Sequence, residues 1–372
     1  MAVFPDLIPG ADFAERQFAG VSLDIEYRIS DGDMFAFKPD DVRPLQPEED
    51  MLLEQYTIAW DEDGFRIPAI QADRYPIMTI GDSFTEGANV PLPWADGVAA
   101  ALDVPVRNYG YRNYGPLEYQ DVLANYATTD ERTWLLYGHF SGNDLGDVMR
   151  SEEQLVAERD PFYLFPWITE QAQRNFEREF RPITKDHYTY PMPTIIGGNY
   201  YDLALHEHLL WWQRAPENGF AESRSYDMLS ETLDMADEIL PETCKAFIFI
   251  PTKEQLYFPY IEFGTRKWLM YVGERPEPGA DGILRLNPAP LGDEDDAQLI
   301  DEILYEQRDA MQALAEEKGW IFIDLLDPFA ERVAQGELLY YKYDTHWNQA
   351  GHTLAADVIA EAVQNAIDCP ME

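Results

Sequence analysis

A serine, a histidine and an aspartate of this 372-residue chain have the types and spacing needed for nucleophilic catalysis. Ser83 lies in GDSFTEG (81–87), directly after an apolar run, whereas Asp344 and His346 lie near the other end of the chain. A serine hydroxyl is a weak nucleophile until a base, most often a histidine oriented by a carboxylate, takes its proton. On an extended segment, side chains two residues apart point the same way. We therefore predict that Asp344 orients His346 and that His346 activates Ser83.

Five short apolar runs, which alternate with amphipathic stretches from residue 75 onward, would have to position these side chains. The runs are YPIMTIGDS (75–83), VPVRNYG (104–110), TWLLYGHFS (133–141), KAFIFIPTK (245–253) and WIFIDLL (320–326). Each has the length and composition of a strand and ends in small or polar residues. The helical stretches are Trp94–Leu102, Leu117–Tyr126, Ser223–Leu240, Ala297–Lys318 and Ala350–Ile367. Strands alternating with helices predict a parallel sheet covered by helices on both faces.

The carboxyl ends of parallel strands open on one edge of a sheet, where α/β proteins usually keep their chemistry. Ser83, Gly110 and Asn143 each end or closely follow one of the predicted strands. Although they are far apart in the sequence, we expect them to converge at that edge with the segment after Leu326. The pattern therefore predicts one candidate site.

The apolar rhythm also indicates the domain organisation. Residues 1–70 show no steady periodicity and predict an irregular N-terminal extension packed on the core. Residues 71–372 predict a single domain with insertions at about 145–220 and 255–296, the first with a helix near Tyr201–Gln213. Loops of this size are usually lids or binding elements, although either one could simply thicken the structure.

The chain is strongly acidic, with 69 Asp and Glu against 27 Lys and Arg and a formal net charge of −42. Repulsion on this scale argues against a nucleic-acid partner or an anionic membrane surface. Only seven of the bases are lysines. An acidic, lysine-poor surface is typical of proteins from a high-salt setting, where counterions screen the repulsion, but it also suits an ordinary acidic protein with a large core.

Cysteine, histidine and hydropathy patterns predict no cofactor or metal. Cys244 and Cys369 indicate neither a disulfide framework nor a metal knuckle, and HEH (206–208) lacks further ligands at metal spacing. No apolar run is long enough to span a bilayer, and the first residues do not resemble a secretory signal. The sequence as written predicts a soluble cytoplasmic protein, or an extracytoplasmic one if an upstream anchor was removed; it leaves the oligomeric state open.

Four segments together resemble the sequence blocks of the SGNH (GDSL-type) hydrolases. GDSFTEG is similar to the first block, with Ser83 as nucleophile, and DTHW (344–347) to the last, which carries acid and base. NYGYRNYG (108–115) and SGND (141–144) are similar to the second and third. The resemblance implies a three-layer α/β/α, flavodoxin-like fold with a parallel five-stranded sheet. It also implies an oxyanion hole formed by the backbone N–H groups of Ser83 and Gly110 and the side-chain amide of Asn143.

Three further segments resemble the branch that contains alginate O-acetyltransferase-like proteins of exopolysaccharide assembly. They are EDGFR (62–66), IPTKEQ (250–255) and DTHWNQAGH (344–352). Most SGNH hydrolases space the acid and base as Asp-x-x-His, whereas this chain has Asp344-Thr-His346, as that branch does. Members of the branch usually act outside the cytoplasm.

The expected activity is acyl transfer through an acyl-enzyme on Ser83. The acceptor is either water, as in an esterase, or a hydroxyl group, as in an O-acyltransferase. The resemblance implies that the acyl group is acetyl. The expected substrate is an O-acetylated carbohydrate or a small acyl ester. Arg66, Lys253 and Tyr257 are candidates for substrate-binding residues at the rim. The alternative is a non-catalytic glycan-binding or scaffold member of an exopolysaccharide or cell-envelope assembly.

Overall fold

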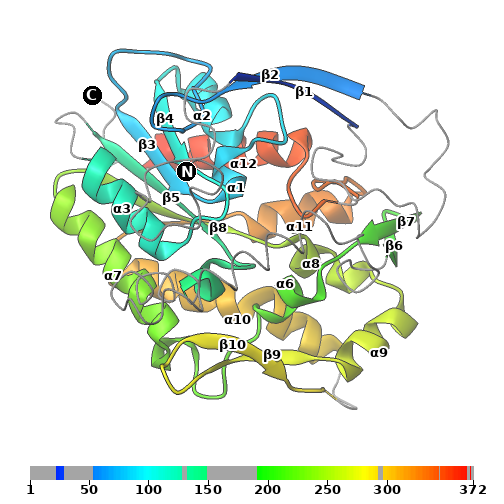
Figure 1. The fold of residues 1–372 in the computed structure, drawn as a ribbon. Coiled ribbons are helices and arrows are strands. Elements are labelled where there is room, and N and C mark those ends of the chain that lie inside the picture. The colour runs from blue at the N-terminus through cyan, green and yellow to red at the C-terminus, as the bar shows by residue number, and fades with distance from the viewer. Residues whose placement is uncertain are drawn as a thin grey trace, which may run out of the picture.

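A five-stranded parallel sheet forms the centre of the computed structural model, which describes residues 22–28, 53–127, 132–148, 191–291, 296–342, 344–366 and 369 (Figure 1). The strand order is β11-β8-β5-β3-β4, and every neighbouring pair is parallel. The strands are β3 (Ile77–Gly81), β4 (Val106–Gly110), β5 (Trp134–Phe140), β8 (Cys244–Ile250) and β11 (Ile321–Asp324). This is the flavodoxin-like order, so the predicted fold class is confirmed.

Helices cover both faces of the sheet and lie close to their predicted bounds (Figure 1). On one face α2 (Trp94–Leu102) packs against α12 (Gln349–Asn365). On the other, α3 (Pro116–Tyr126) packs against α7 (Arg224–Ile239), and α10 (Asp296–Glu317) contacts β8 and β11. Right-handed crossovers between parallel strands produce this division. Within the described residues, no helix is long and apolar enough to cross a membrane.

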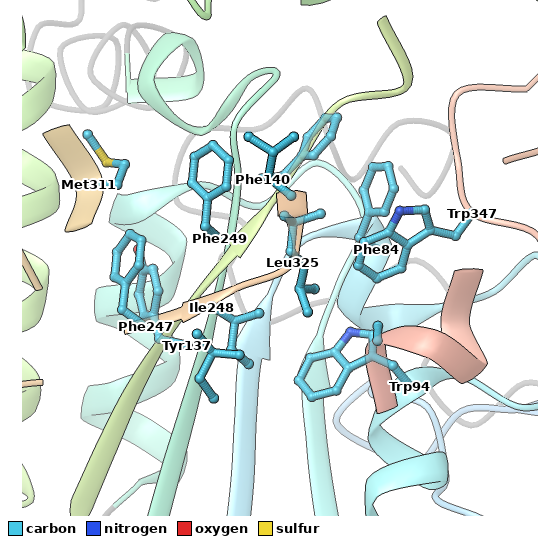
Figure 2. Close-up of a cluster of buried hydrophobic side chains, with 14 of the residues drawn as sticks. Phe84, Trp94, Tyr137, Phe140, Phe247, Ile248, Phe249, Met311, Leu325 and Trp347 are labelled. Carbon is cyan, nitrogen blue, oxygen red and sulfur yellow. The ribbon is translucent and has the colours of Figure 1, made fainter. Parts of the chain in front are cut away.

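Aromatic side chains dominate the core and extend to the residue beside Ser83. All seven residues of β5 are buried, as expected for a central strand covered on both faces. In Figure 2 the rings of Tyr137 and Phe247 stack at 5.5 Å between centroids, and Phe84 meets Trp347 edge to face at 5.1 Å. The serine is therefore followed by a core anchor, which limits its movement.

The N-terminal part is not irregular throughout, contrary to the prediction. Two strands, β1 (Ser22–Arg28) and β2 (Leu53–Ala59), form an antiparallel pair. Trp60 and Phe65 are buried after β2, and Phe65 belongs to the main core. The strand residues mix charges with aromatic and β-branched side chains, so no clean two-residue alternation marks them in the sequence.

From residue 191 onward, the predicted first insertion forms a hairpin of β6 (Pro191–Ile196) and β7 (Asn199–Ala204). The predicted helix at Tyr201–Gln213 is wrong in its first half, because only α6 (Glu207–Trp211) is helical there. Gly197 and Gly198 have φ angles of 54° and 81°, which a tight hairpin turn requires. Residues 149–190 of the predicted insertion lie outside the described residues.

The remaining elements are short and surround the carboxyl edge of the sheet. They are α1 (Ser83–Glu86), η4 (Phe220–Glu222), α8 (Lys253–Tyr257), η5 (Phe258–Tyr260), α9 (Phe263–Tyr271), β9 (Glu274–Pro278), β10 (Leu284–Pro288) and α11 (Leu326–Ala334). The described part of the predicted second insertion, 255–296, thus contains the end of α8, the short helix η5, the helix α9 and the antiparallel hairpin β9–β10.

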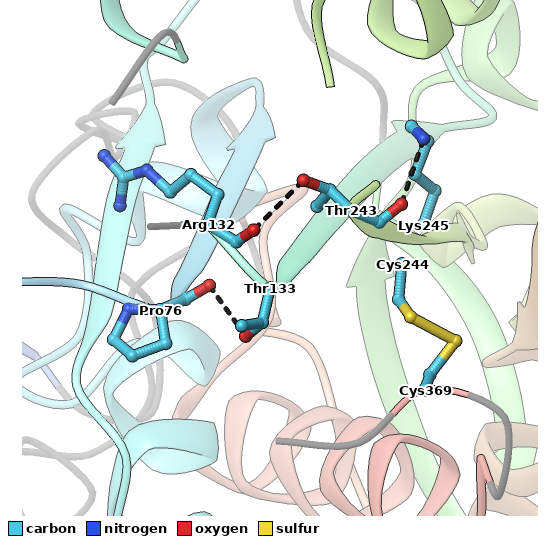
Figure 3. The surroundings of a disulfide bond; sticks show 7 residues. All are labelled: Pro76, Arg132, Thr133, Thr243, Cys244, Lys245 and Cys369. Carbon is cyan, nitrogen blue, oxygen red and sulfur yellow. Dashed lines mark hydrogen bonds between the residues drawn. A yellow bond between two sulfur atoms is a disulfide. The ribbon is translucent and has the colours of Figure 1, made fainter. Parts of the chain in front are cut away.

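A disulfide joins Cys244 and Cys369, which corrects the expectation that these cysteines form no such framework (Figure 3). Cys244 begins β8, and Cys369 follows α12, with a Cα–Cα distance of 5.8 Å. The bond lies at the amino end of β8, so it is at the opposite end of that strand from the predicted site. A pair separated by 125 residues gives no local sequence signal.

Removing this cross-link is expected to destabilise the fold without changing the site. The Cys244→Ser/Cys369→Ser variant should lose about 2–5 kcal/mol of unfolding free energy, because the bond restricts a long loop of the unfolded chain. Denaturant titration of the variant and of the reduced wild-type protein measures this loss. Equal midpoints for the oxidised, reduced and variant forms would contradict the assignment.

Candidate active site

The turn between β3 and α1 presents Ser83 at the carboxyl end of the sheet. Phe84 N donates to Asp82 Oδ1 at 2.9 Å, so Asp82 caps α1 and defines its first turn. Ser83 is the first residue of the helix, and its N–H has no acceptor within that helix. Gly87 ends α1 with a φ of 62°, a conformation that favours glycine. Ser83 is half-buried, whereas Asp82 is buried.

Ser83, His346 and Asp344 form a continuous chain of hydrogen bonds. Ser83 Oγ lies 2.8 Å from His346 Nε2, and His346 Nδ1 lies 2.6 Å from Asp344 Oδ1. His346 N also donates to Asp344 Oδ1 at 2.7 Å. An ionised carboxylate only accepts hydrogen bonds, so Nδ1 carries the proton and Nε2 accepts from the serine hydroxyl. The structure thus brings together the three residues that the sequence singled out.

Charge and burial set complementary protonation states for this acid and base. Burial alone would raise the pKa of Asp344, but the charge and hydrogen bonds of His346 outweigh it and hold that pKa below its usual value. Burial alone would lower the pKa of His346, but the charge and hydrogen bond of Asp344 outweigh it and raise that pKa above the usual 6.5. Asp344 is therefore ionised at neutral pH and favours a proton on His346.

Buried aromatic side chains fix the segment that carries the acid and base. Tyr340 Oη donates to Pro251 O at 2.6 Å, and Tyr341 Oη donates to Asn89 O at 2.8 Å. Trp347, directly after the histidine, is fully buried. These contacts hold the segment against the ends of β8 and of the loop after α1, so its geometry does not depend on a bound ligand.

Asn143 follows β5 and is oriented by a carboxylate. Its Nδ2 donates to Asp147 Oδ2 at 2.9 Å, and the residue is half-buried. Because a carboxylate requires a donor, Asp147 determines which end of the amide carries the nitrogen. An amide nitrogen carries two hydrogens, and the bond to Asp147 uses one of them. Asp147 was not singled out by the sequence.

Gly110 serves packing, and its N–H is not aimed at an oxyanion, which corrects that part of the prediction. Gly110 N donates to Asn108 Oδ1 at 2.8 Å, and Asn108 Nδ2 donates to Thr85 O at 2.7 Å. A Cβ on Gly110 would lie 2.5 Å from Glu86 N. A glycine is therefore needed here because α1 approaches the end of β4 so closely.

Arg66 was predicted to bind substrate at the rim of the site, and its burial shows that this prediction is wrong. It is only 5% exposed, and its guanidinium donates to backbone carbonyls of the loop after α1, those of Gly87, Val90 and Pro91. These bonds hold the chain where it leaves α1. Arg66 therefore supports the site from within the fold and does not line its opening.

Lys253 and Tyr257 are likewise buried, each with no exposed surface, so neither lies at the rim as predicted. Tyr257 Oη accepts a hydrogen bond from Leu339 N at 3.0 Å. The sequence segment IPTKEQ placed both residues correctly after β8, but backbone carbonyls from distant parts of the chain surround Lys253, and a distant backbone N–H binds Tyr257.

An ion pair between buried Glu86, the last residue of α1, and half-buried Arg112 was not predicted from the sequence. Arg112 Nε and Nη2 donate to the two carboxylate oxygens of Glu86, at 2.9 and 2.6 Å, and Trp60 Nε1 donates to the same carboxylate at 3.0 Å. The pair joins α1 to the loop after β4 and to the segment after β2. Two oppositely charged residues 26 positions apart give no sequence signal of pairing. Within the described residues, no cluster of three or more His, Cys, Asp or Glu side chains could hold a metal ion.

Part of the chain matches the model of a known protein family. The family model described as "SGNH hydrolase-like domain, acetyltransferase AlgX" matches residues 284–370, the part that carries Asp344 and His346. This match confirms the resemblance predicted from the sequence. No curated protein matches the chain.

Solved structures of low sequence identity also align with the chain. LAE5, an alpha/beta hydrolase enzyme from the metagenome of Lake Arreo, is 12% identical; the alignment covers 79% of this chain and 96% of LAE5, with a TM-score of 0.38. A mutant of an acetyl-xylooligosaccharide esterase from Geobacillus Stearmophilus is 11% identical, with 79% and 95% coverage and a TM-score of 0.37.

Proposed function

Because residues 284–370 match the SGNH hydrolase-like acetyltransferase family, we propose that the protein transfers acyl groups through a covalent ester on Ser83. The observation that carries the proposal is the hydrogen-bonded chain from Ser83 Oγ through His346 to Asp344, with distances of 2.8 and 2.6 Å. Such a chain provides a nucleophile, a general base and a group that orients the base.

In the first half-reaction Ser83 Oγ attacks the ester carbonyl carbon while His346 Nε2 takes the hydroxyl proton. The carbonyl π bond opens and leaves a negative charge on its oxygen. When this intermediate collapses, the bond to the alcohol breaks and His346 returns the proton to the departing oxygen. Asp344 stabilises the imidazolium in between. Water or a sugar hydroxyl then attacks the acyl-enzyme by the same steps in reverse.

The negative oxygen requires hydrogen-bond donors in place before the reaction. Ser83 N–H, at the start of α1, and the second hydrogen of Asn143 Nδ2 are the donors that we assign to this role. Gly110 is omitted because its N–H is bound to Asn108. Each correctly placed donor typically contributes about 10²–10³-fold to turnover.

We assign acetyl as the acyl group and a carbohydrate as donor or acceptor. The support for acetyl is the family match over residues 284–370, whose description names an acetyltransferase. The support for a carbohydrate is the resemblance of EDGFR, IPTKEQ and DTHWNQAGH to alginate O-acetyltransferase-like proteins. Hydrolysis and transfer use the same three residues, so the difference lies in whether water or a bound hydroxyl reaches the acyl-enzyme.

A donor–acceptor assay tests the proposal. The protein is incubated with p-nitrophenyl acetate, with and without an oligosaccharide, and the products are identified by mass spectrometry. Acetylated sugar indicates transfer, and acetate alone indicates hydrolysis. If the protein, in low or molar salt, releases p-nitrophenol no faster than buffer does, the catalytic proposal fails and the non-catalytic alternative is favoured.

The acid limb of the pH profile is expected above pH 6.5. His346 must be neutral to accept the serine proton, and Asp344 raises the pKa of its imidazole above 6.5 in the free protein. As the pH falls through that raised pKa, His346 becomes protonated and kcat/KM decreases. Initial rates across the pH range measure the limb. A kcat/KM that stays constant well below pH 6.5 would contradict this assignment.

We further propose that the protein folds in an oxidising compartment, as expected for an extracytoplasmic protein. The Cys244–Cys369 bond supports this, because such bonds persist mainly outside reducing cytosol. Alkylating the cells of origin before lysis tests the location. Both cysteines alkylated would oppose it, whereas two unmodified cysteines that react only after reduction would agree.

A further inference from the structure

A lysine with no exposed surface lies behind the segment that carries the acid and base. Lys253 Nζ donates to Lys342 O at 2.8 Å and to Asp344 O at 3.1 Å. Its third hydrogen bond, at 2.8 Å, goes to Ala204 O at the end of β7. One side chain thus joins the first insertion to the backbone of the proposed catalytic acid.

The number of acceptors indicates the charged form. Three carbonyl oxygens surround Nζ, and only an ammonium has three hydrogens to donate. Burial lowers the pKa of Lys253, while the neighbouring carboxylates of Glu254 and Asp344 oppose that effect. A buried ammonium with all its hydrogens bound in this way permits little movement of the carbonyls around it.

Glu254 fixes the neighbouring part of the insertion. Its Oε1 accepts from His206 N at 2.7 Å, two residues after the carbonyl of Ala204 that Lys253 binds. Ala204 N in turn donates to Lys342 O at 2.8 Å. Ala204 and His206 are therefore held beside Lys342 and Asp344, through adjacent residues of α8 and through the bond from Ala204 N to Lys342 O.

We infer that Lys253 is a positioning residue that holds the backbone of Asp344, and through it the His346 ring, at bonding distance from Ser83. The inference rests on the proposed function for its kinetic consequence but not for its geometry. The hydrogen bonds of Lys253 Nζ go to backbone carbonyls, so it acts on the site through the backbone of Lys342 and Asp344.

The Lys253→Met variant tests this, because methionine has a similar length but cannot donate. We expect kcat for an acetyl ester to fall about 10²-fold with KM unchanged, since small displacements of catalytic groups affect the chemical step. The far-downfield proton resonance of His346 Nδ1–H, which its short bond to Asp344 predicts, should weaken or shift. Lys245→Met is the matched control: Lys245 Nζ also donates to a backbone carbonyl, that of Thr243, but at the other end of β8. It should leave kcat and the resonance as in the wild type.

Lys253→Met/Glu254→Gln separates positioning from folding. The double variant removes both buried charges, so no uncompensated Glu254 carboxylate remains in the core. It should unfold at a temperature close to that of Lys245→Met and keep the loss of kcat and of the resonance. A wild-type kcat and resonance in the double variant would overturn the inference, and so would its failure to fold, because a positioning residue is not needed for the core. If the wild-type protein has no esterase activity at all, the proposed function fails, while the resonance still decides the role of Lys253.

Discussion

Replacing Ser83 with alanine is expected to lower kcat for an acetyl ester by a factor on the order of 10⁵–10⁶, to near the background rate. The substitution removes the hydroxyl oxygen on which the proposed acyl-enzyme forms, and His346 and Asp344 then have no serine proton to move. Ser83 is half-buried, its Oγ lies 2.8 Å from His346 Nε2, and alanine is a good helix former, so the fold should be unaffected. Initial rates at saturating substrate measure the loss. Adding a tight-binding serine inhibitor shows whether contaminating active enzyme causes any residual rate.

Ser141→Ala provides the matched control for this result. Ser141 follows β5 at the same edge of the sheet and is 2% exposed, and its hydroxyl donates to the amide oxygen Gln255 Oε1 at 3.5 Å, which is not a base. Its alanine variant should keep the wild-type kcat. A large loss in Ser141→Ala together with an active Ser83→Ala would mean that the nucleophile has been misidentified.

Asp344→Asn should lower kcat about 10⁴-fold while leaving KM little changed. A neutral amide cannot stabilise the imidazolium that forms when His346 takes the proton of Ser83. Its oxygen can still accept from His346 N, as Asp344 Oδ1 does, so the local backbone should be kept. Steady-state kinetics of the purified variant measure the effect.

The control for this substitution is Asp324→Asn. Asp324 is the last residue of β11, but its carboxylate binds Arg308 and caps Leu326 N, at 2.8 Å in both cases. An asparagine can still cap a helix, so activity should persist. If instead Asp324→Asn is inactive and Asp344→Asn active, the acid has been assigned to the wrong residue.

The sheet and the three catalytic candidates could be predicted because their signals are local. Each parallel strand is a continuous apolar run, such as β5, that only a fully covered strand explains. Ser83 and His346 end up together because parallel strands share one carboxyl edge, a rule that needs no knowledge of side-chain contacts. The pairing of Asp344 with His346 follows from their spacing alone.

Roles that depend on backbone contacts between distant segments could not be predicted. Lys253 and Arg66 were expected at the rim because charged side chains are usually exposed, but carbonyls from distant segments surround both. Gly110 was expected to donate to an oxyanion, and the side chain of Asn108, only two residues away, takes that hydrogen instead. Nothing in the residue types distinguishes these outcomes.

The hairpin β6–β7 is a different case, because its signal was present. Ile196-Gly197-Gly198-Asn199 places two glycines between runs rich in β-branched and aromatic residues, a pattern typical of a two-residue turn. The helix predicted near Tyr201–Gln213 competes with that signal, and the pairing of β7 with β6 excludes a helix over the first residues of that range. Of the predicted range Tyr201–Gln213, only Glu207–Trp211, after the end of β7, is helical.

Intact-protein mass spectrometry after treatment with a fluorophosphonate, followed by peptide mapping, examines the nucleophile itself. The reagent phosphonylates a serine only when a neighbouring base activates its hydroxyl. One added phosphonyl group, carried by the peptide that contains residue 83 and absent from Ser83→Ala, is the predicted result. An unmodified mass after prolonged exposure in both low and molar salt, or a label carried by any other peptide, would contradict it.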